Sequence, residues 1–104
     1  QEFWVLFLNR ANKILKGYKA SDGGVSHTVA DPKRIFKAAL EHNASNLVLC
    51  HNHPSGNLSP SKADHRLTKK LIAAAKNLDM SIIDHIIVTD GGYYSFADEG
   101  ELGE

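Results

Sequence analysis

The chain has 104 residues, of which 42% are hydrophobic and 23% are charged, and this ordinary globular composition excludes a disordered or fibrous chain. Its length suits one compact domain over residues 1–104, and a domain of this size buries roughly 60–68% of its unfolded surface. The 12 Lys and Arg balance 12 Asp and Glu, so the formal net charge is zero and lacks the basic excess that is typical of nucleic-acid-binding proteins.

The first part of the chain predicts strands followed by a helix. The apolar run Phe3–Leu8 is short enough for a buried strand, and residues 13–20 would form its partner after a turn. A short β-prone segment follows at 25–29. Asp31 is a typical helix N-cap and is followed by a proline, which predicts a helix from residue 32 to about residue 41.

The next predicted elements are a strand and a longer helix. The strand covers residues 46–53, because the Pro-Ser-Gly turn at 54–56 cannot easily continue it. Ser59 and Pro60 repeat the pattern of a cap followed by a proline, and predict a second helix that lasts to about residue 78. The predicted inward stripe of this helix is Leu67, Leu71, Ala74 or Ala75, and Leu78.

Two strands are predicted to close the chain. They cover residues 81–89 and 93–96, and Asp90-Gly91-Gly92 between them is a hairpin signal. The complete order is strands, helix, strand, helix, strands. It favours a central mixed sheet flanked by helices, which is an α/β or α+β fold.

Two histidines and a carboxylate are predicted to lie close together between the strand at 46–53 and the helix that follows it. His51 and His53 are two residues apart and therefore project from the same face of the strand. Ser61 and Asp64 are three residues apart in the first turns of the helix, so they share a helical face that a short loop can bring back to the strand end. Two imidazoles and a carboxylate suit zinc, and three protein ligands leave one position to water, as in catalytic sites. We therefore predict a metal site of His51, His53 and Asp64.

Each part of this pattern is weak when it stands alone. A His-x-His pair is more often a satisfied or surface pair, and Ser61 and Asp64 taken singly would be ordinary residues of a helix start. Together they resemble the RadC group of the JAB/MPN (JAMM) metalloenzyme domains, whose signature is Glu…His-x-His-x(7)-Ser-x-x-Asp. His51, His53, Ser61 and Asp64 match that signature within the RadC-type sequence His-Asn-His-Pro-Ser-Gly. Two more segments resemble the family, Pro32-Lys33-Arg34-Ile35-Phe36 and Asp84-His85-Ile86-Ile87-Val88.

The resemblance covers nearly the whole chain and carries expectations for fold and chemistry. It implies a JAB/MPN-like curved mixed β-sheet flanked by helices, with the layering of cytidine deaminases. It also implies one zinc ion per chain and hydrolysis of a peptide or isopeptide bond by metal-activated water. Glu2 matches the family's general base, with an exposed terminal carboxylate as the alternative interpretation. Ser61 would donate to the oxyanion that forms on the substrate.

Two other functions stay open at this point. One is a non-catalytic MPN-like interaction module, which the intact set of ligands disfavours. The other is the DNA-repair role that the RadC label suggests, although longer members place a helix-hairpin-helix-like region before this domain and we expect this chain to lack it. The neutral charge does not support a nucleic-acid partner, so a protein or peptide substrate is the expected partner. Edge strands could support a homodimer.

Further single residues carry weaker signals. His85 lies in an apolar strand and is either a core histidine or a partner that orients a metal ligand. Cys50 has the opposite strand parity to the histidines and is predicted to be a small core residue. As the only cysteine it excludes an internal disulfide and favours a reducing compartment, so we expect a cytoplasmic protein. No apolar run approaches the ~20 residues of a membrane span, and no signal peptide is visible.

Overall fold

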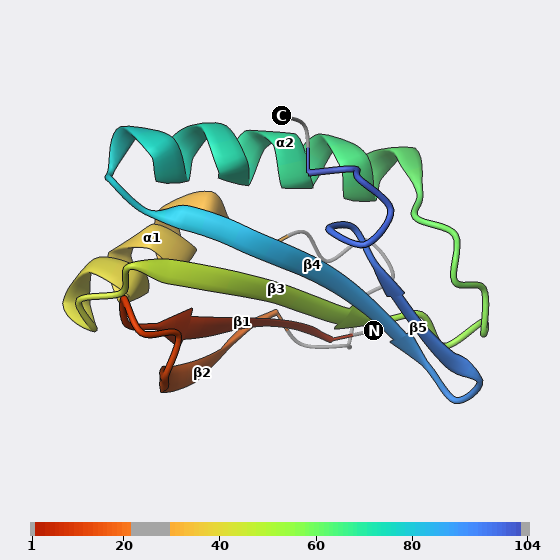
Figure 1. Ribbon diagram of the computed structural model, residues 1–104. Coiled ribbons are helices and arrows are strands. Elements are labelled where there is room, and N and C mark those ends of the chain that lie inside the picture. Colours follow the sequence, from red (N-terminus) through yellow and green to blue (C-terminus); the bar gives the residue numbers. More distant parts are fainter. Residues whose placement is uncertain (1, 22–29, 103–104) are drawn as a thin grey trace.

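The structure is a computed structural model that describes residues 2–21 and 30–102 (Figure 1). The β-prone segment predicted at 25–29 lies outside the described residues. In chain order the elements are β1 (Phe3–Leu8), β2 (Ile14–Ser21), α1 (Pro32–Glu41), β3 (Asn46–Asn52), α2 (Lys62–Asn77), β4 (Ser81–Thr89) and β5 (Gly92–Ser95). The predicted mixed α+β class is confirmed.

The strands of the described residues form one sheet in the order β2-β1-β3-β4-β5. The β3–β4 pair is parallel, whereas β1 pairs antiparallel with β2 and β3, and β4 pairs antiparallel with β5. A parallel pair needs a long crossover connection, and α2 supplies it between β3 and β4. The strand β3 is therefore central, with Phe3 of β1 opposite His51 and His85 of β4 opposite Leu49.

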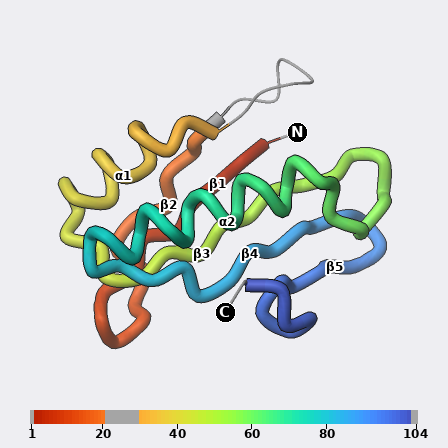
Figure 2. Tube along the Cα trace, turned by 90° about the horizontal axis from the view of Figure 1, so that it is seen from above, coloured from red at the N-terminus to blue at the C-terminus, as the bar shows by residue number. Residues whose placement is uncertain are grey.

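One face of the sheet carries the hydrophobic core. Alternate residues of the central strands are buried on this face, and they pack in one cluster with buried residues of α1 and α2. Members of that cluster include Val5, Phe7, Leu47 and Leu49 of the sheet, Ile35 and Ala39 of α1, and Leu71 and Ala75 of α2. Seen from above, α2 lies over β3 and β4, and α1 lies toward β2 (Figure 2). Both helices therefore cover the same face.

The opposite face of the sheet is more open. Neither α1 nor α2 covers it, and it presents large side chains such as Trp4, Val88 and Tyr93, which are 37%, 40% and 64% exposed. Cys50 pairs with Trp4 across the β1–β3 ladder and belongs to this face. It is therefore half-buried, and the prediction of a core residue was wrong because neither α1 nor α2 covers its side of the strand.

The start of α2 also differs from the prediction. Ser61 caps the helix, and Ser59 and Pro60 precede it. The reason is a capping box: Asp64 N donates to Ser61 Oγ at 3.0 Å, and Ser61 N donates to Asp64 Oδ2 at 2.8 Å. This reciprocal pair satisfies two backbone N–H groups that the first helical turn cannot satisfy itself.

The inward face of α2 was predicted in part. Leu71 and Ala75 are buried as expected, but Leu78 is the C-cap residue and is 40% exposed. Thr68, a polar residue, lies on the buried face. Within residues 2–21 and 30–102, no helix is long and apolar enough to cross a membrane.

Candidate metal centre

The histidines come from the end of the central strand β3. Leu47, Leu49 and His51 alternate on its buried face, as the sequence pattern predicts, and only 2% of His51 is exposed. His53 follows just after the strand, where its backbone N–H still donates to the Val88 carbonyl at 3.1 Å. The chain then turns at Pro54, so the two imidazoles remain at the C-terminal end of the central strand.

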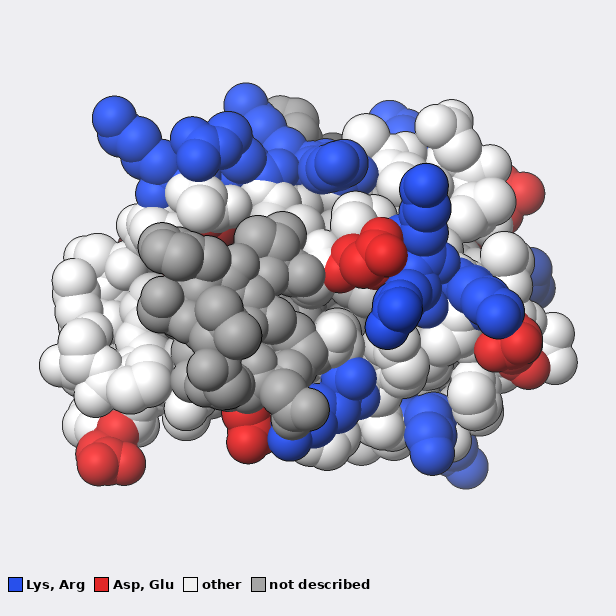
Figure 3. All heavy atoms as spheres, turned by 180° about the vertical axis from the view of Figure 1, so that it is seen from behind, with Lys and Arg blue, Asp and Glu red and all other residues white. Residues whose placement is uncertain are grey.

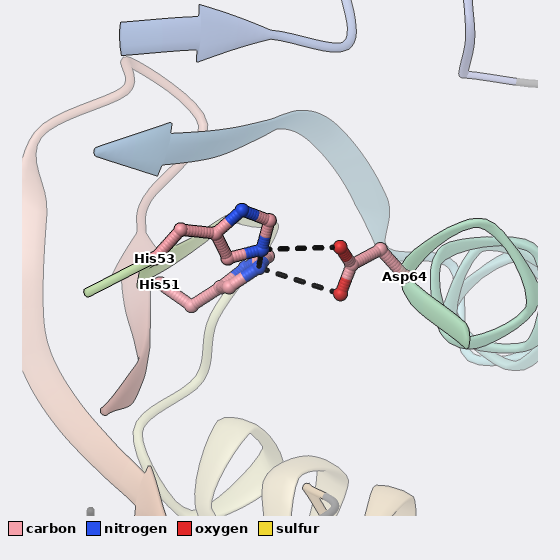
Figure 4. A group of neighbouring side chains, drawn as sticks. All are labelled: His51, His53 and Asp64. Atoms are coloured by element: carbon pink, nitrogen blue, oxygen red, sulfur yellow. Dashed lines mark hydrogen bonds and ion pairs between the residues drawn. The ribbon is translucent and has the colours of Figure 1, made fainter. Parts of the chain in front are cut away.

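The carboxylate comes from the first turn of α2. Asp64 is the third residue of the helix, and the capping box with Ser61 fixes its side chain. Figure 4 shows the carboxylate of Asp64 pointing from the helix toward the rings of His51 and His53. The same hydrogen bonds that begin the helix thus also orient this carboxylate.

The three side chains converge on one point. His51 Nε2 lies 3.0 Å from His53 Nε2 and 3.4 Å from Asp64 Oδ1, and His53 Nε2 lies 3.3 Å from Asp64 Oδ2 (Figure 4). One donor atom from each residue lies within 4.8 Å of the others, which is the spacing of a group that can hold a metal ion. Sequence spacing alone predicts this set, and the fold brings all three residues together.

The hydrogen bond of His53 shows that this group fits a cation. His53 Nδ1 lies 2.7 Å from the Asn57 carbonyl oxygen. A carbonyl can only accept, so Nδ1 carries the proton and Nε2 of neutral His53 carries a lone pair. That lone pair faces a carboxylate oxygen of Asp64, which is also an acceptor. A proton on His53 Nε2 or a metal ion between these two acceptors removes their repulsion, and imidazole with carboxylate is a donor set suited to divalent zinc.

Burial and charge shift two pKa values at this centre. Burial alone would raise the pKa of Asp64, but the interactions with His51 and with Ser61 outweigh it and hold that pKa well below its ordinary value. Burial lowers the pKa of His85 to about 3. Asp64 is therefore anionic and His85 neutral at physiological pH.

His85 has the features of both alternatives that the sequence left open, a core histidine and a partner of a metal ligand. It is fully buried, and its ring stacks on Phe96 with the centroids 4.6 Å apart. Its Nε2 also lies 2.8 Å from Nδ1 of His51, on the side of the His51 ring that faces away from Asp64. His85 is thus a core histidine that contacts a candidate ligand directly.

Ser61 lies at the edge of the candidate centre. It is exposed, and its hydroxyl oxygen accepts the Asp64 backbone N–H, which leaves the hydroxyl proton free to be donated elsewhere. A cleft of about 440 Å³ opens there, lined by His53, Pro54, Ser55, Asn57, Ser59, Pro60, Ser61 and Asp64. The candidate oxyanion donor and two candidate ligands therefore share one cleft.

Glu2 is near the centre in its backbone but not in its side chain. Its backbone N–H donates to Asn52 Oδ1 at 2.6 Å, beside both histidines in the sequence. Its carboxylate accepts from Trp4 Nε1 at 3.0 Å and lies 3.5 Å from Lys19 Nζ. Trp4 and Lys19 pair with each other on the face of the sheet opposite the core. The structure does not place the Glu2 carboxylate among the candidate ligands.

Sequence reasoning missed two groups that hold the histidines. Thr68 Oγ1 lies 2.6 Å from His85 Nδ1 and donates to the Asp64 carbonyl at 2.7 Å. Its position four residues after Asp64, on the same helical face, was an available signal. The Asn57 partner of His53 is a backbone carbonyl. Every residue has such a group, so the sequence carries no signal for it.

Comparison with known proteins places the same residues in a family context. The model of the family described as "RadC-like JAB domain" matches residues 1–101. A relative from Flavobacterium johnsoniae named "UPF0758 protein" is 52% identical over 100 residues, which cover 96% of this chain and 44% of the relative. A protein of the same name from Porphyromonas gingivalis is 48% identical over 103 residues, which cover 98% of this chain and 45% of the relative.

A third relative is shorter. "UPF0758 protein YeeS" of Escherichia coli strain K12 is 42% identical over 102 residues, which cover 98% of this chain and 69% of the relative. This chain spans a little less than half the length of the first two relatives. The printed names state no activity, substrate or ligand.

Proposed function

The chain belongs to the RadC-like JAB domain family, and from that membership we propose that it is a zinc-dependent hydrolase that cleaves the amide bond of a peptide or an isopeptide. The observation that carries the proposal is the convergence of His51 Nε2, His53 Nε2 and the Asp64 carboxylate beside a cleft that His53 and Asp64 line. Three protein ligands leave a tetrahedral zinc ion one open position, which is the arrangement of catalytic rather than structural zinc sites.

The metal would supply a nucleophile. His51, His53 and Asp64 would hold the zinc ion, which would lower the pKa of water toward about 7 and so make hydroxide available at neutral pH. The Ser61 hydroxyl lines the same cleft and can donate its proton to a substrate oxygen that gains negative charge. The substrate would lie in that cleft. Besides His53 and Asp64, the residues that line it are uncharged.

We assign the transfer of the proton to Glu2. Its carboxylate would take the proton of the attacking water and return it to the amine that leaves. In the structure this carboxylate is held by Trp4 and Lys19. The assignment therefore requires the side chain to leave these partners and reach the core face, where the histidines lie.

The test is a search for zinc-dependent amide cleavage in a wide set of substrates. The zinc-loaded chain is incubated with a proteome-derived peptide library that includes isopeptide-linked lysines, and new amino groups are identified by mass spectrometry. We expect cleavage that disappears with a chelator and in His53→Ala. Zinc bound at one ion per chain with no zinc-dependent cleavage anywhere in the library would contradict hydrolysis and favour an interaction module.

Nucleic-acid binding is a second candidate because both helices carry several exposed cations. Figure 3 shows Lys and Arg side chains along α2 and over α1. The residues are Lys33, Arg34 and Lys37 of α1, and Lys62, Arg66, Lys69, Lys70 and Lys76 of α2. A salt-dependent mobility shift with duplex DNA would support this role, and no shift at low salt would count against it.

A further inference from the structure

Four residues form a closed ring of contacts around the candidate centre. The Thr68 hydroxyl donates to the Asp64 carbonyl at 2.7 Å and lies 2.6 Å from His85 Nδ1. His85 Nε2 lies 2.8 Å from His51 Nδ1, and His51 Nε2 lies 3.4 Å from Asp64 Oδ1, which closes the ring. The ring connects α2, β4 and β3, so it joins the two elements that supply the candidate ligands.

The positions of the protons in this ring follow from simple counting. A threonine hydroxyl has one proton, and Thr68 gives it to a carbonyl that can only accept. At 2.6 Å from that oxygen, His85 Nδ1 must therefore be the donor, because two lone pairs at this distance would repel. Neutral His85 then has an unprotonated Nε2, which can only accept from His51 Nδ1. The proton of His51 is thereby held on Nδ1, and its Nε2 presents a lone pair toward Asp64.

We propose that Thr68 and His85 are positioning residues that hold His51 in the one neutral tautomer able to bind a metal through Nε2. The inference rests on the proposed metal centre, and it adds that a residue without any contact to the metal decides whether His51 is ready for it. Thr68 acts through His85, and His85 acts through His51.

Burial makes the tautomer of His51 depend on these four residues. His85 and Thr68 are 0% and 2% exposed, so water cannot easily replace a missing partner. If the hydroxyl of Thr68 were removed, the Nδ1–H of His85 would lose its acceptor. His85 would then gain by moving its proton to Nε2, where it would donate to His51 Nδ1. That change moves the proton of His51 to Nε2, the atom that must bind the metal.

The test uses two variants of Thr68 and a control on the same helix face. Thr68→Val keeps the shape of the side chain and removes the hydroxyl, whereas Thr68→Ser keeps the hydroxyl. Leu71→Val is the control, because it shortens a buried side chain three residues further along α2 that belongs to the hydrophobic core. Zinc affinity is measured by competition with a chromophoric chelator, and unfolding by urea reports the stability of each variant.

We expect Thr68→Val to bind zinc about 10–100-fold more weakly than the parent chain, which is the usual cost of losing a partner of a metal ligand. Thr68→Ser should restore the affinity, and Leu71→Val should lower stability without changing the affinity. Equal zinc affinity in Thr68→Val and the parent chain would overturn the proposal. A parent chain that binds no zinc would instead refute the proposed function.

A measurement on the unaltered chain tests the tautomer without any variant or metal. Long-range ¹H–¹⁵N correlation spectra of metal-free protein at neutral pH distinguish the two nitrogens of each histidine. We expect His85 to carry its proton on Nδ1 and to accept at Nε2. A proton on Nε2 of His85 would overturn the inference whether or not the chain binds zinc.

Discussion

His51 and His53 are held by partners of different kinds, and this difference determines how each responds to substitution. The Nδ1 of His53 donates to the backbone carbonyl of Asn57, which no side-chain replacement removes. The Nδ1 of His51 depends on the side chains of His85 and Thr68. Zinc affinity should therefore tolerate side-chain changes at residue 57 and respond to changes at residues 68 and 85.

The grouping of the candidate ligands could be predicted from the sequence, but the direction of the Glu2 side chain could not. The spacing of His51, His53 and Asp64 restricts them to one strand end and one helix start, so local geometry brings them together. Glu2 is at a strand start where two faces are available. Its carboxylate contacts Trp4, two residues further on the same face of the strand, and Lys19 of β2, a non-local partner that the sequence pattern does not reveal.

Glu2→Gln tests whether that carboxylate transfers a proton. The amide cannot accept the proton of water, so we expect turnover of an identified substrate to fall about 10²–10⁴-fold. Zinc content should stay unchanged, because Glu2 is not a ligand. The measurement is kcat together with zinc stoichiometry on the same preparations.

The matched control for this prediction is Trp4→Phe. It removes the indole N–H that donates to Glu2 and leaves the carboxylate in place. Turnover in this variant should equal or exceed that of the parent chain. Full activity in Glu2→Gln would remove Glu2 from the mechanism.

At the scale of elements, the start of α2 serves the fold and the candidate centre together. The capping box of Ser61 and Asp64 begins the helix and orients a candidate ligand. Ser59, which is followed by a proline, was predicted as the cap, although the Ser-x-x-Asp spacing of a capping box begins at Ser61 and was an available signal. The reciprocal hydrogen bond from Ser61 N to the Asp64 carboxylate decides between the two serines. The residue at the same spacing from Ser59 is Lys62, whose side chain cannot accept such a bond.

Ser61→Ala should have two separable effects. Loss of the cap should lower the free energy of unfolding by about 1 kcal/mol. Loss of the hydroxyl should lower kcat on an identified substrate about 10²–10³-fold. Urea unfolding measures the first effect and steady-state kinetics the second.

Ser61→Gly separates the two effects. Glycine is a tolerated N-cap, so stability should fall by only a few tenths of a kcal/mol, as is usual for this replacement. The kcat should fall as far as in Ser61→Ala, since glycine also lacks the hydroxyl. Normal turnover in Ser61→Gly would show that Ser61 acts only as a helix cap.

At the same scale, sequence patterns predicted several strands correctly. The run Phe3–Leu8 and the segment Ser81–Thr89 coincide with β1 and β4. Alternation also predicts the buried face of β3. The alternation does not show which face of the sheet the helices cover, because this depends on how α1 and α2 cross the sheet. Cys50 was misplaced for that reason.

For the whole molecule, the one-sided arrangement places the candidate centre at the end of the core. The helices and the buried face of the sheet enclose Phe3, His85 and His51, while the other face of the sheet has no helix among the described residues (Figure 1). That open face and the edge strands β2 and β5 are where a homodimer would form, which stays a prediction. The stability of the whole fold should also depend on His85, since it is buried in a neutral form.

The metal-free chain should lose stability as the pH falls below about 6.5. The pKa of His85 is lowered to about 3 in the folded chain from its ordinary value of 6.5, mainly by burial. Below pH 6.5 the unfolded chain therefore binds a proton that the folded chain does not. This group makes its full contribution to stability above pH 6.5 and loses it progressively toward pH 3, by at most about 1.4 kcal/mol per pH unit.

Urea unfolding between about pH 6.5 and 5.5, roughly one unit above the ordinary pKa of a glutamate, measures this loss. His85→Gln should show a shallower dependence on pH over the same range, because the titrating group is gone. Parallel curves for the two chains would contradict a neutral, buried His85.

The central claim is that His51, His53 and Asp64 hold one zinc ion, and elemental analysis of the parent chain and of His53→Ala tests it most directly. Both proteins are incubated with zinc, freed of unbound metal and analysed for zinc per chain. We predict one zinc per parent chain and none in His53→Ala. The absence of zinc from both proteins after incubation would contradict the metal centre and the catalytic roles assigned around it.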